Sequence, residues 1–242
     1  TKVTYVVTYP KSTKEYSIDG LLVVAKDVDP VNSVIYNNEP SENTGEVYET
    51  KIAPENIYSV EAMTKLFDEL NELDAVKTDS THLAELKQLL TDIVSHPLKA
   101  LPEIAVAINT AAKRNGGSFS RTTGIKVKVN TLKAANTSEM SAAEVFVHEL
   151  THAAIDFAIT ELSHSAPQAL TQLKRLRAQA MKVLTVEDLL PEVVTDRKEE
   201  LILAKKRWDY MFTSKYGLTE FLAYALTNKA TRKKLNTIKV AR

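Results

Sequence analysis

At residues 148–152 the sequence reads His148-Glu149-Leu150-Thr151-His152. Residues four apart on an α-helix lie one above the other on the same face, so the imidazoles of His148 and His152 can bind a single metal ion if this stretch is helical. Glu149 then has its carboxylate beside the open position of the metal, where it can deprotonate a bound water. The spacing therefore predicts a metal site with a neighbouring general base.

Two other interpretations of these five residues stay open. The first is a chance match on a helix that happens to carry two of the five histidines of the chain. The second is a degenerate site that keeps its shape but has lost its metal or its activity, because a motif alone does not establish a working site.

The residues on either side of the motif predict a long helix. Ser141 and Glu144 form a capping box, and the run from 145 to 162 contains neither Gly nor Pro. We expect five apolar residues to bury this helix and hold the imidazoles still, namely Val145, Leu150, Ala154, Phe157 and Ala158.

Composition narrows the ligand set and the class of protein. The 242 residues include no cysteine, so a zinc ion would be held by histidine and carboxylate, the ligand set typical of catalytic zinc. Basic and acidic residues number 31 each, which argues against nucleic-acid binding driven by net charge. No apolar run approaches the roughly 18 residues that span a bilayer, and no signal peptide is recognisable. We expect a soluble protein without disulfides and, because it starts at Thr1 rather than Met, a fragment or a processed product.

Residues 1–58 predict a small β-rich module. Stretches 3–9, 21–25 and 47–52 are typical of strands, and the polar stretch 37–45 is typical of an exposed loop. Nothing in this part has catalytic spacing, so we expect a flanking domain or an interaction surface. The boundary is expected between about Pro54 and Ser80, with the second domain covering 59–242.

The next segment predicts two core helices followed by strands. Apolar residues recur at helical spacing over 59–73 and 81–94. His82 and His96 flank the second of these helices and have no partner at metal spacing, so we expect surface or capping residues.

Residues 102–108 and 125–129 predict strands, and Asn115-Gly116-Gly117 predicts a turn between them. The second strand alternates perfectly, which indicates one solvated face. An edge strand beside the motif helix would hold an extended peptide by strand addition.

Two long helices, 166–184 and 186–212, are predicted after the motif and form a helical insertion at about 165–213. The second is heavily charged, which indicates a solvated face. We expect Trp208, Tyr210 and Phe212 to be packing residues, and the basic stretch 229–242 to be a solvated helix end.

A catalytic zinc needs a third protein ligand, and the sequence offers two candidates. The metzincin pattern fails, because the sixth residue after His152 is Ala158. His164 is one candidate, in a short loop predicted at 163–167 after the motif helix. Glu220 is the better one, because the stretch YGLTEFLAYAL at 216–226 predicts a new helix with this acid in its first turn.

These segments together resemble a known family. HELTH followed by Ala153, Ala154 and Asp156 resembles the thermolysin-type gluzincins, in which two His and a Glu from a second helix hold zinc. The segment YGLTEFLAYAL is similar to the corresponding helix of anthrax lethal factor and of the metallopeptidase domains of very large bacteriophage proteins. The resemblance covers roughly residues 100–230.

The resemblance implies an α+β fold, with a zincin-like and mainly helical metallopeptidase domain built around a small sheet. It implies that His148, His152 and Glu220 bind Zn²⁺. Glu149 would be the general base, and Tyr216 would donate a hydrogen bond in the transition state.

One position departs from the family pattern. Relatives commonly have a second acid four residues after the ligand Glu, and this chain has Tyr224, which alters the support of the metal. Asp156 either orients a ligand histidine or is an exposed helix carboxylate.

The first functional hypothesis is a zinc endopeptidase with a polypeptide substrate and with neither nucleic acid nor membrane as a partner. The second is a non-catalytic structural or delivered component of a phage particle that keeps the peptidase fold. A third is a regulatory or toxin module whose N-terminal β segment binds the target. The sequence does not indicate a location, and the second hypothesis is consistent with a protein in a virion or, after delivery, in a host cell.

Overall fold

The computed structural model of the chain divides into two compact units, residues 1–44 and 45–242. It describes residues 46–75, 78–97, 99, 101–132, 140–190 and 197–237, together with three strands of the first unit. These strands are β1 (Tyr5–Val6), β2 (Thr13–Ile18) and β3 (Leu21–Lys26), in the order β1-β3-β2. The strand predicted at 21–25 is confirmed, and the loop predicted at 37–45 lies outside the described residues.

The second unit contains a four-stranded sheet. Its strands are β4 (Glu49–Ile52), β5 (Val106–Asn109), β6 (Ala111–Ser120) and β7 (Gly124–Asn130), in the order β4-β5-β7-β6. The central strands β5 and β7 are parallel, whereas β4 and β6 run antiparallel to their neighbours. Because β4 pairs with β5, residues that precede the boundary predicted at 58 already belong to this second unit.

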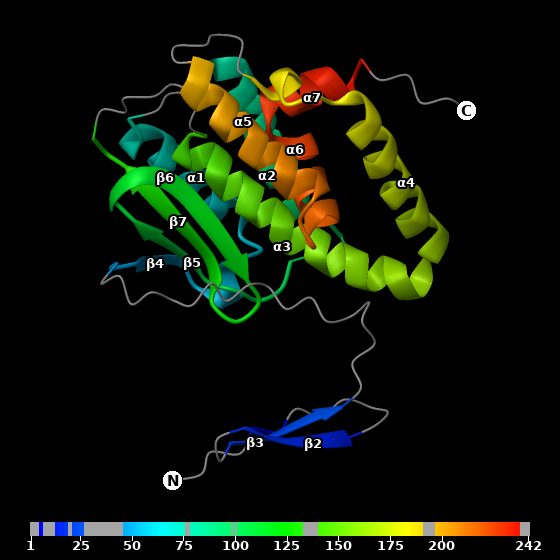
Figure 1. Ribbon diagram of the computed structural model, residues 1–242. Coiled ribbons are helices and arrows are strands. Elements are labelled where there is room, and N and C mark those ends of the chain that lie inside the picture. Colours follow the sequence, from blue (N-terminus) through cyan, green and yellow to red (C-terminus); the bar gives the residue numbers. More distant parts are fainter. Residues whose placement is uncertain are drawn as a thin grey trace. The chain divides into compact units, whose positions relative to one another are not determined.

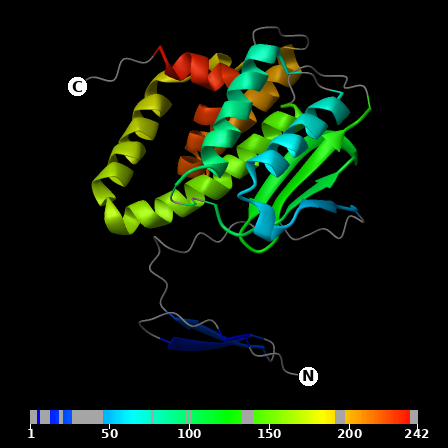
Figure 2. The same cartoon turned by 180° about the vertical axis from the view of Figure 1, so that it is seen from behind.

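Helices cover this sheet, so the architecture is α+β as predicted (Figure 1). The described α-helices are α1 (Val60–Leu73), α2 (Ser80–Val94), α3 (Ala142–Ser165), α4 (Pro167–Val183), α5 (Arg197–Phe212), α6 (Gly217–Thr227) and α7 (Lys229–Leu235). Two short 3-10 helices, η1 (Pro54–Asn56) and η2 (Glu187–Leu189), connect elements. Seen from behind, α1 and α2 lie in front of α3 (Figure 2), and α3 contacts both of them as well as β6, β7, α4 and α6.

Helix α3 is the central element of the second unit. Its N-cap is Ser141, whose hydroxyl accepts the N–H of Glu144 at 3.2 Å, as the capping pattern predicted. Every residue from 142 to 153 is buried, because the first half of the helix is inserted between the sheet and the other helices. Contacts on all sides therefore fix the part of the helix that carries the motif.

The second half of α3 is less buried than the sequence predicted. Val145 and Leu150 are in the core, whereas Ala154, Phe157 and Ala158 are only half-buried. The half-buried residues lie in the second half of the helix, beyond the part that packs against the sheet, and this half leads into α4 (Figure 1).

The turn predicted at Asn115-Gly116-Gly117 is wrong, because these residues lie inside β6. The register of β6 against β7 shifts between Ala111 and Gly116, where the regular ladder is interrupted. The Asn115 amide compensates by accepting the N–H of Asn130 at 2.7 Å and donating to Asp74 at 2.8 Å. The side chain of Asn115 thus provides hydrogen bonds where the β6–β7 ladder is irregular, and it does not form a hairpin turn.

The single helix predicted over 186–212 is also wrong. Residues 187–189 form η2, which is separate from α5 (Arg197–Phe212). Leu190 is extended, with a ψ of 146°. Proline disfavours the helical conformation of the residue before it, so Pro191 ends any helix at this point.

Two further residues differ from the predictions, and three agree with them. His82 is buried rather than exposed, with its Nε2 3.7 Å from Oε1 of Glu144, whereas His96 is exposed as predicted. Tyr210 is 53% exposed and is not a packing residue. Trp208 and Phe212 do pack, with ring centroids 5.2 Å apart.

Candidate metal centre

Three side chains from two helices converge on one point. His148 and His152 come from α3 and Glu220 comes from the first turn of α6, and one ligand atom of each lies within 4.8 Å of the others. The two Nε2 atoms are 3.1 Å apart, and Oε2 of Glu220 is 3.4 Å from Nε2 of His152 and 3.8 Å from Nε2 of His148. A tetrahedral zinc ion spaces its ligand atoms about 3.4 Å apart. The three groups could therefore hold a metal ion.

The helical insertion determines where Glu220 lies. On α4, the Arg177 guanidinium donates hydrogen bonds to the carbonyls of Met211 at 2.7 Å and Phe212 at 2.8 Å, which end α5. Helix α6 then starts at Gly217, where a Cβ would lie 2.1 Å from Arg177 and 2.7 Å from the Met211 carbonyl. Only glycine fits this position, so the close packing of α4 on the α5–α6 junction sets the first turn of α6 and the carboxylate that it presents.

The pKa values of Glu220 and His152 are shifted by the charged and polar groups around them. Burial disfavours ionisation of Glu220, but hydrogen bonds and charge from His148 and His152 outweigh it and lower its pKa to about 2. Burial disfavours protonation of His152, but Glu220, Glu149 and Asp156 outweigh it and raise its pKa. A histidine ligand must be neutral, so a metal ion displaces this proton, and metal binding is expected to weaken as pH falls.

Glu149 lies between α3 and the edge strand β6. Its pKa is raised by burial, against the opposing effects of His152 and His148 and of a hydrogen bond to the Phe119 backbone. A carboxyl group with a raised pKa accepts a proton more readily than an exposed one, which suits a general base.

The bare backbone of Gly117 makes room for this carboxylate. A Cβ at Gly117 would lie 2.6 Å from Cγ of Glu149, 2.9 Å from its Oε1 and 2.6 Å from Cγ1 of Val145. Real Cβ atoms do not approach other atoms so closely, so any larger residue displaces Glu149, β6 or α3.

We expect Gly117→Ala to lower the melting temperature of the protein by several degrees, because overpacking costs about 1–3 kcal/mol. Gly116→Ala is the matched control, since no atom lies within 4 Å of a Cβ at that neighbouring position. Differential scanning calorimetry of both variants measures the difference. Equal melting temperatures for the two variants would show that Gly117 is not a tight contact.

Other side chains lie around the histidines, outside the ligand group. Asp156 is buried and paired with Arg121, so it is not the exposed carboxylate that the sequence left open. Nδ1 of His148 lies 3.0 Å from Oγ1 of Thr227, and the Tyr224 ring centroid lies 4.6 Å from that of His148. Sequence reasoning missed Thr227, although its spacing of seven residues from Glu220 puts both on one face of α6.

Two further residues, His164 and Tyr216, were candidates for the site in the sequence. His164 lies in the last turn of α3, so the loop predicted at 163–167 is wrong, and it is exposed and outside the ligand group. Tyr216 is the N-cap residue of α6, and its carbonyl accepts the N–H of Glu220 at 3.1 Å. Its hydroxyl oxygen is buried, and the Lys215 ammonium lies 4.8 Å from its ring centroid.

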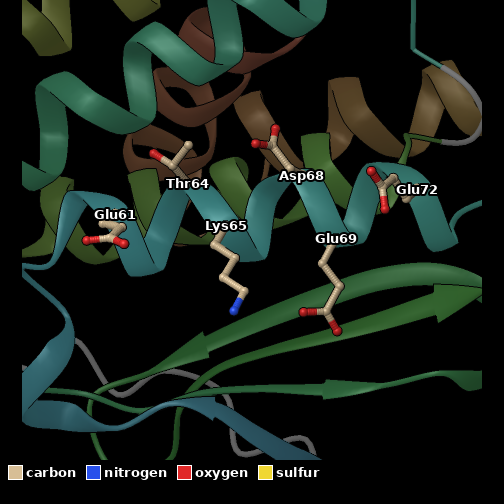
Figure 3. Close-up of a pocket in the computed structure, with 6 residues that line it drawn as sticks. All are labelled: Glu61, Thr64, Lys65, Asp68, Glu69 and Glu72. Carbon is tan, nitrogen blue, oxygen red and sulfur yellow. The ribbon is translucent and has the colours of Figure 1, made fainter.

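A hollow elsewhere on the second unit is lined by polar residues of α1 (Figure 3). The lining residues are Glu61, Thr64, Lys65, Asp68, Glu69 and Glu72. Two of these acids are paired, Asp68 with Lys87 at 2.8 Å and Glu69 with Lys51 at 3.5 Å. None of the three ligand residues lines this hollow, and we assign it no function.

The chain matches no family model, no curated protein and no solved structure. Within the described ranges, no helix is both long enough and apolar enough to cross a membrane. The gluzincin assignment therefore stays a prediction that depends on the motif and on the geometry of the site.

Proposed function

We propose that this chain is a zinc-dependent peptidase with a zincin-like catalytic domain, in which His148, His152 and Glu220 hold the metal. The observation that carries the proposal is the convergence of these three ligand atoms within 4.8 Å. Three protein ligands with an open fourth position are typical of catalytic rather than structural zinc. When bound, such an ion polarises a carbonyl group and lowers the pKa of a water molecule.

Glu149 would move the protons of the reaction. It follows His148 on α3 and is buried beside the ligand group, so its carboxylate can take a proton from the attacking water. The same group would return that proton to the leaving amine of the cleaved peptide. The buried position against β6 would keep the carboxylate in place through both transfers.

The substrate proposed is an extended polypeptide paired with β6. In the sheet order, β7 is an inner strand and β6 is the outer strand, and β6 contacts α3. An outer strand offers unpaired backbone groups, which an extended peptide can bind as an additional strand. The edge strand that we expected beside the motif helix is therefore β6 and not the alternating strand at 125–129.

The direct test is hydrolysis of an unstructured protein such as casein by the zinc-loaded protein. We expect cleavage that stops on removal of the metal by a chelator and returns when zinc is added. Absence of cleavage by a folded protein that binds one zinc would favour the non-catalytic hypothesis. Cleavage that survives complete metal removal would contradict a metal-dependent mechanism.

Tyr216→Phe tests the role that the family resemblance implies for this hydroxyl. A donor that acts only in the transition state should, when lost, reduce kcat by ~10²-fold with little change in KM or zinc affinity. Tyr48→Phe is the control, because Tyr48 is half-buried, is not one of the ligand residues, and its hydroxyl donates to Glu46 two residues away, at 3.3 Å. Parental turnover in Tyr216→Phe, or loss of zinc from it, would assign Tyr216 a structural role.

A further inference from the structure

The direction of the hydrogen bond between His148 and Thr227 can be inferred from the two contacts of the Thr227 hydroxyl. Oγ1 of Thr227 lies 2.7 Å from the carbonyl oxygen of Ala223, one turn earlier in α6, and 3.0 Å from Nδ1 of His148. A hydroxyl group has one proton to donate, and a carbonyl oxygen can only accept. The Thr227 hydroxyl therefore donates to Ala223 and accepts from the Nδ1–H of His148.

This direction determines the tautomer of His148. With its proton on Nδ1, a neutral imidazole has its lone pair on Nε2. Nε2 is the atom that lies 3.1 Å from Nε2 of His152 and 3.8 Å from Glu220. The bond to Thr227 thus leaves the nitrogen that faces the ligand group free to bind a cation.

The surroundings keep this bond in place. Thr227 is completely buried, and His148 is 6% exposed. The Tyr224 ring packs against His148 at a tilt of 54° and limits rotation of the imidazole. Both contacts come from α6, the helix that also supplies Glu220.

We propose that Thr227 is a positioning residue of the metal centre, which orients His148 and selects its metal-binding tautomer. The inference rests on the proposed metal binding by His148, His152 and Glu220. Because the partner is a neutral hydroxyl, it orients the ring without adding the negative charge that a carboxylate partner would bring. The Thr227 hydroxyl and the Tyr224 ring together hold the imidazole of His148 in one orientation.

The test is a zinc titration of the metal-free protein against a competing chelator. Thr227→Val keeps the shape of the side chain and removes the acceptor, and should weaken zinc binding by ~10- to 100-fold. Thr227→Ser keeps the hydroxyl and should restore most of the affinity. Thr151→Val is the matched control. Thr151 is also buried, and its hydroxyl also donates to the carbonyl one turn earlier, at 2.7 Å. It makes neither the hydrogen bond to His148 nor the ring contact with it.

The outcomes separate this inference from the proposed function. If the parent protein binds no zinc, the proposed function fails; if the parent and Thr227→Val bind zinc equally well, only the role of Thr227 is overturned. Should Thr227→Val not fold, the tautomer is still measurable in the metal-free parent by ¹⁵N NMR of the His148 ring. A proton on Nδ1 is the expected result, and a neutral ring with its proton on Nε2 would overturn the inference.

Discussion

Glu149→Gln is expected to slow peptide hydrolysis by ~10²- to 10⁴-fold while zinc remains bound, which is the usual effect of losing a general base. The amide has nearly the shape of the carboxylate but cannot take the proton of the attacking water. Glu149 is not among the three ligand residues, so the affinity for zinc should change little. The measurement is kcat with a fluorogenic peptide, together with zinc content.

Glu161→Gln provides the matched control for this experiment. Glu161 is an exposed acid on the same helix, and its replacement removes the same charge away from the ligand group. We expect parental turnover from this variant. If Glu149→Gln also cleaves at the parental rate, Glu149 is not the base, and the proposed proton transfers are wrong.

The second large effect is expected on zinc binding. Glu220→Ala should weaken zinc affinity by more than the ~10- to 100-fold that follows the loss of an orienting residue, because it removes a direct ligand. Combining His148→Ala with His152→Ala should abolish zinc binding at this site. Isothermal titration of the metal-free variants measures both effects.

His164→Ala distinguishes the two sequence candidates for the third ligand. His164 is exposed and lies outside the ligand group, so its removal should leave zinc affinity at the parental value. Loss of affinity in the His164 variant, with full affinity in Glu220→Ala, would overturn both the ligand set and the family assignment.

The elements that carry the site could be predicted because their signals are local. The spacing of His148 and His152 needs only helical geometry, and Ser141 marks the start of the helix by its own hydrogen bond to the backbone. Helix α6 was also predictable, since residues 221–226 are all apolar or aromatic and include neither Gly nor Pro. What these patterns could not provide is the distance between the two helices, which depends on packing between distant segments.

The surroundings of the site depend on contacts that no local pattern encodes. Gly116 and Gly117 look like a turn after Asn115, yet Gly117 is a glycine because Glu149 of a different element occupies the space beside it. The partner of Thr227 is 79 residues away in the sequence. Tertiary contacts of this kind override local preference, as they do at Asn115 in the irregular part of β6.

Anomalous diffraction on both sides of the zinc absorption edge, from crystals grown with zinc, tests the central claim most directly. We predict one anomalous peak per chain, at about 2.0–2.2 Å from Nε2 of His148, Nε2 of His152 and a carboxylate oxygen of Glu220. Two results would contradict the claim that this group is a zinc centre. One is an ordered site without an anomalous peak, and the other is a zinc ion bound by residues other than His148, His152 and Glu220.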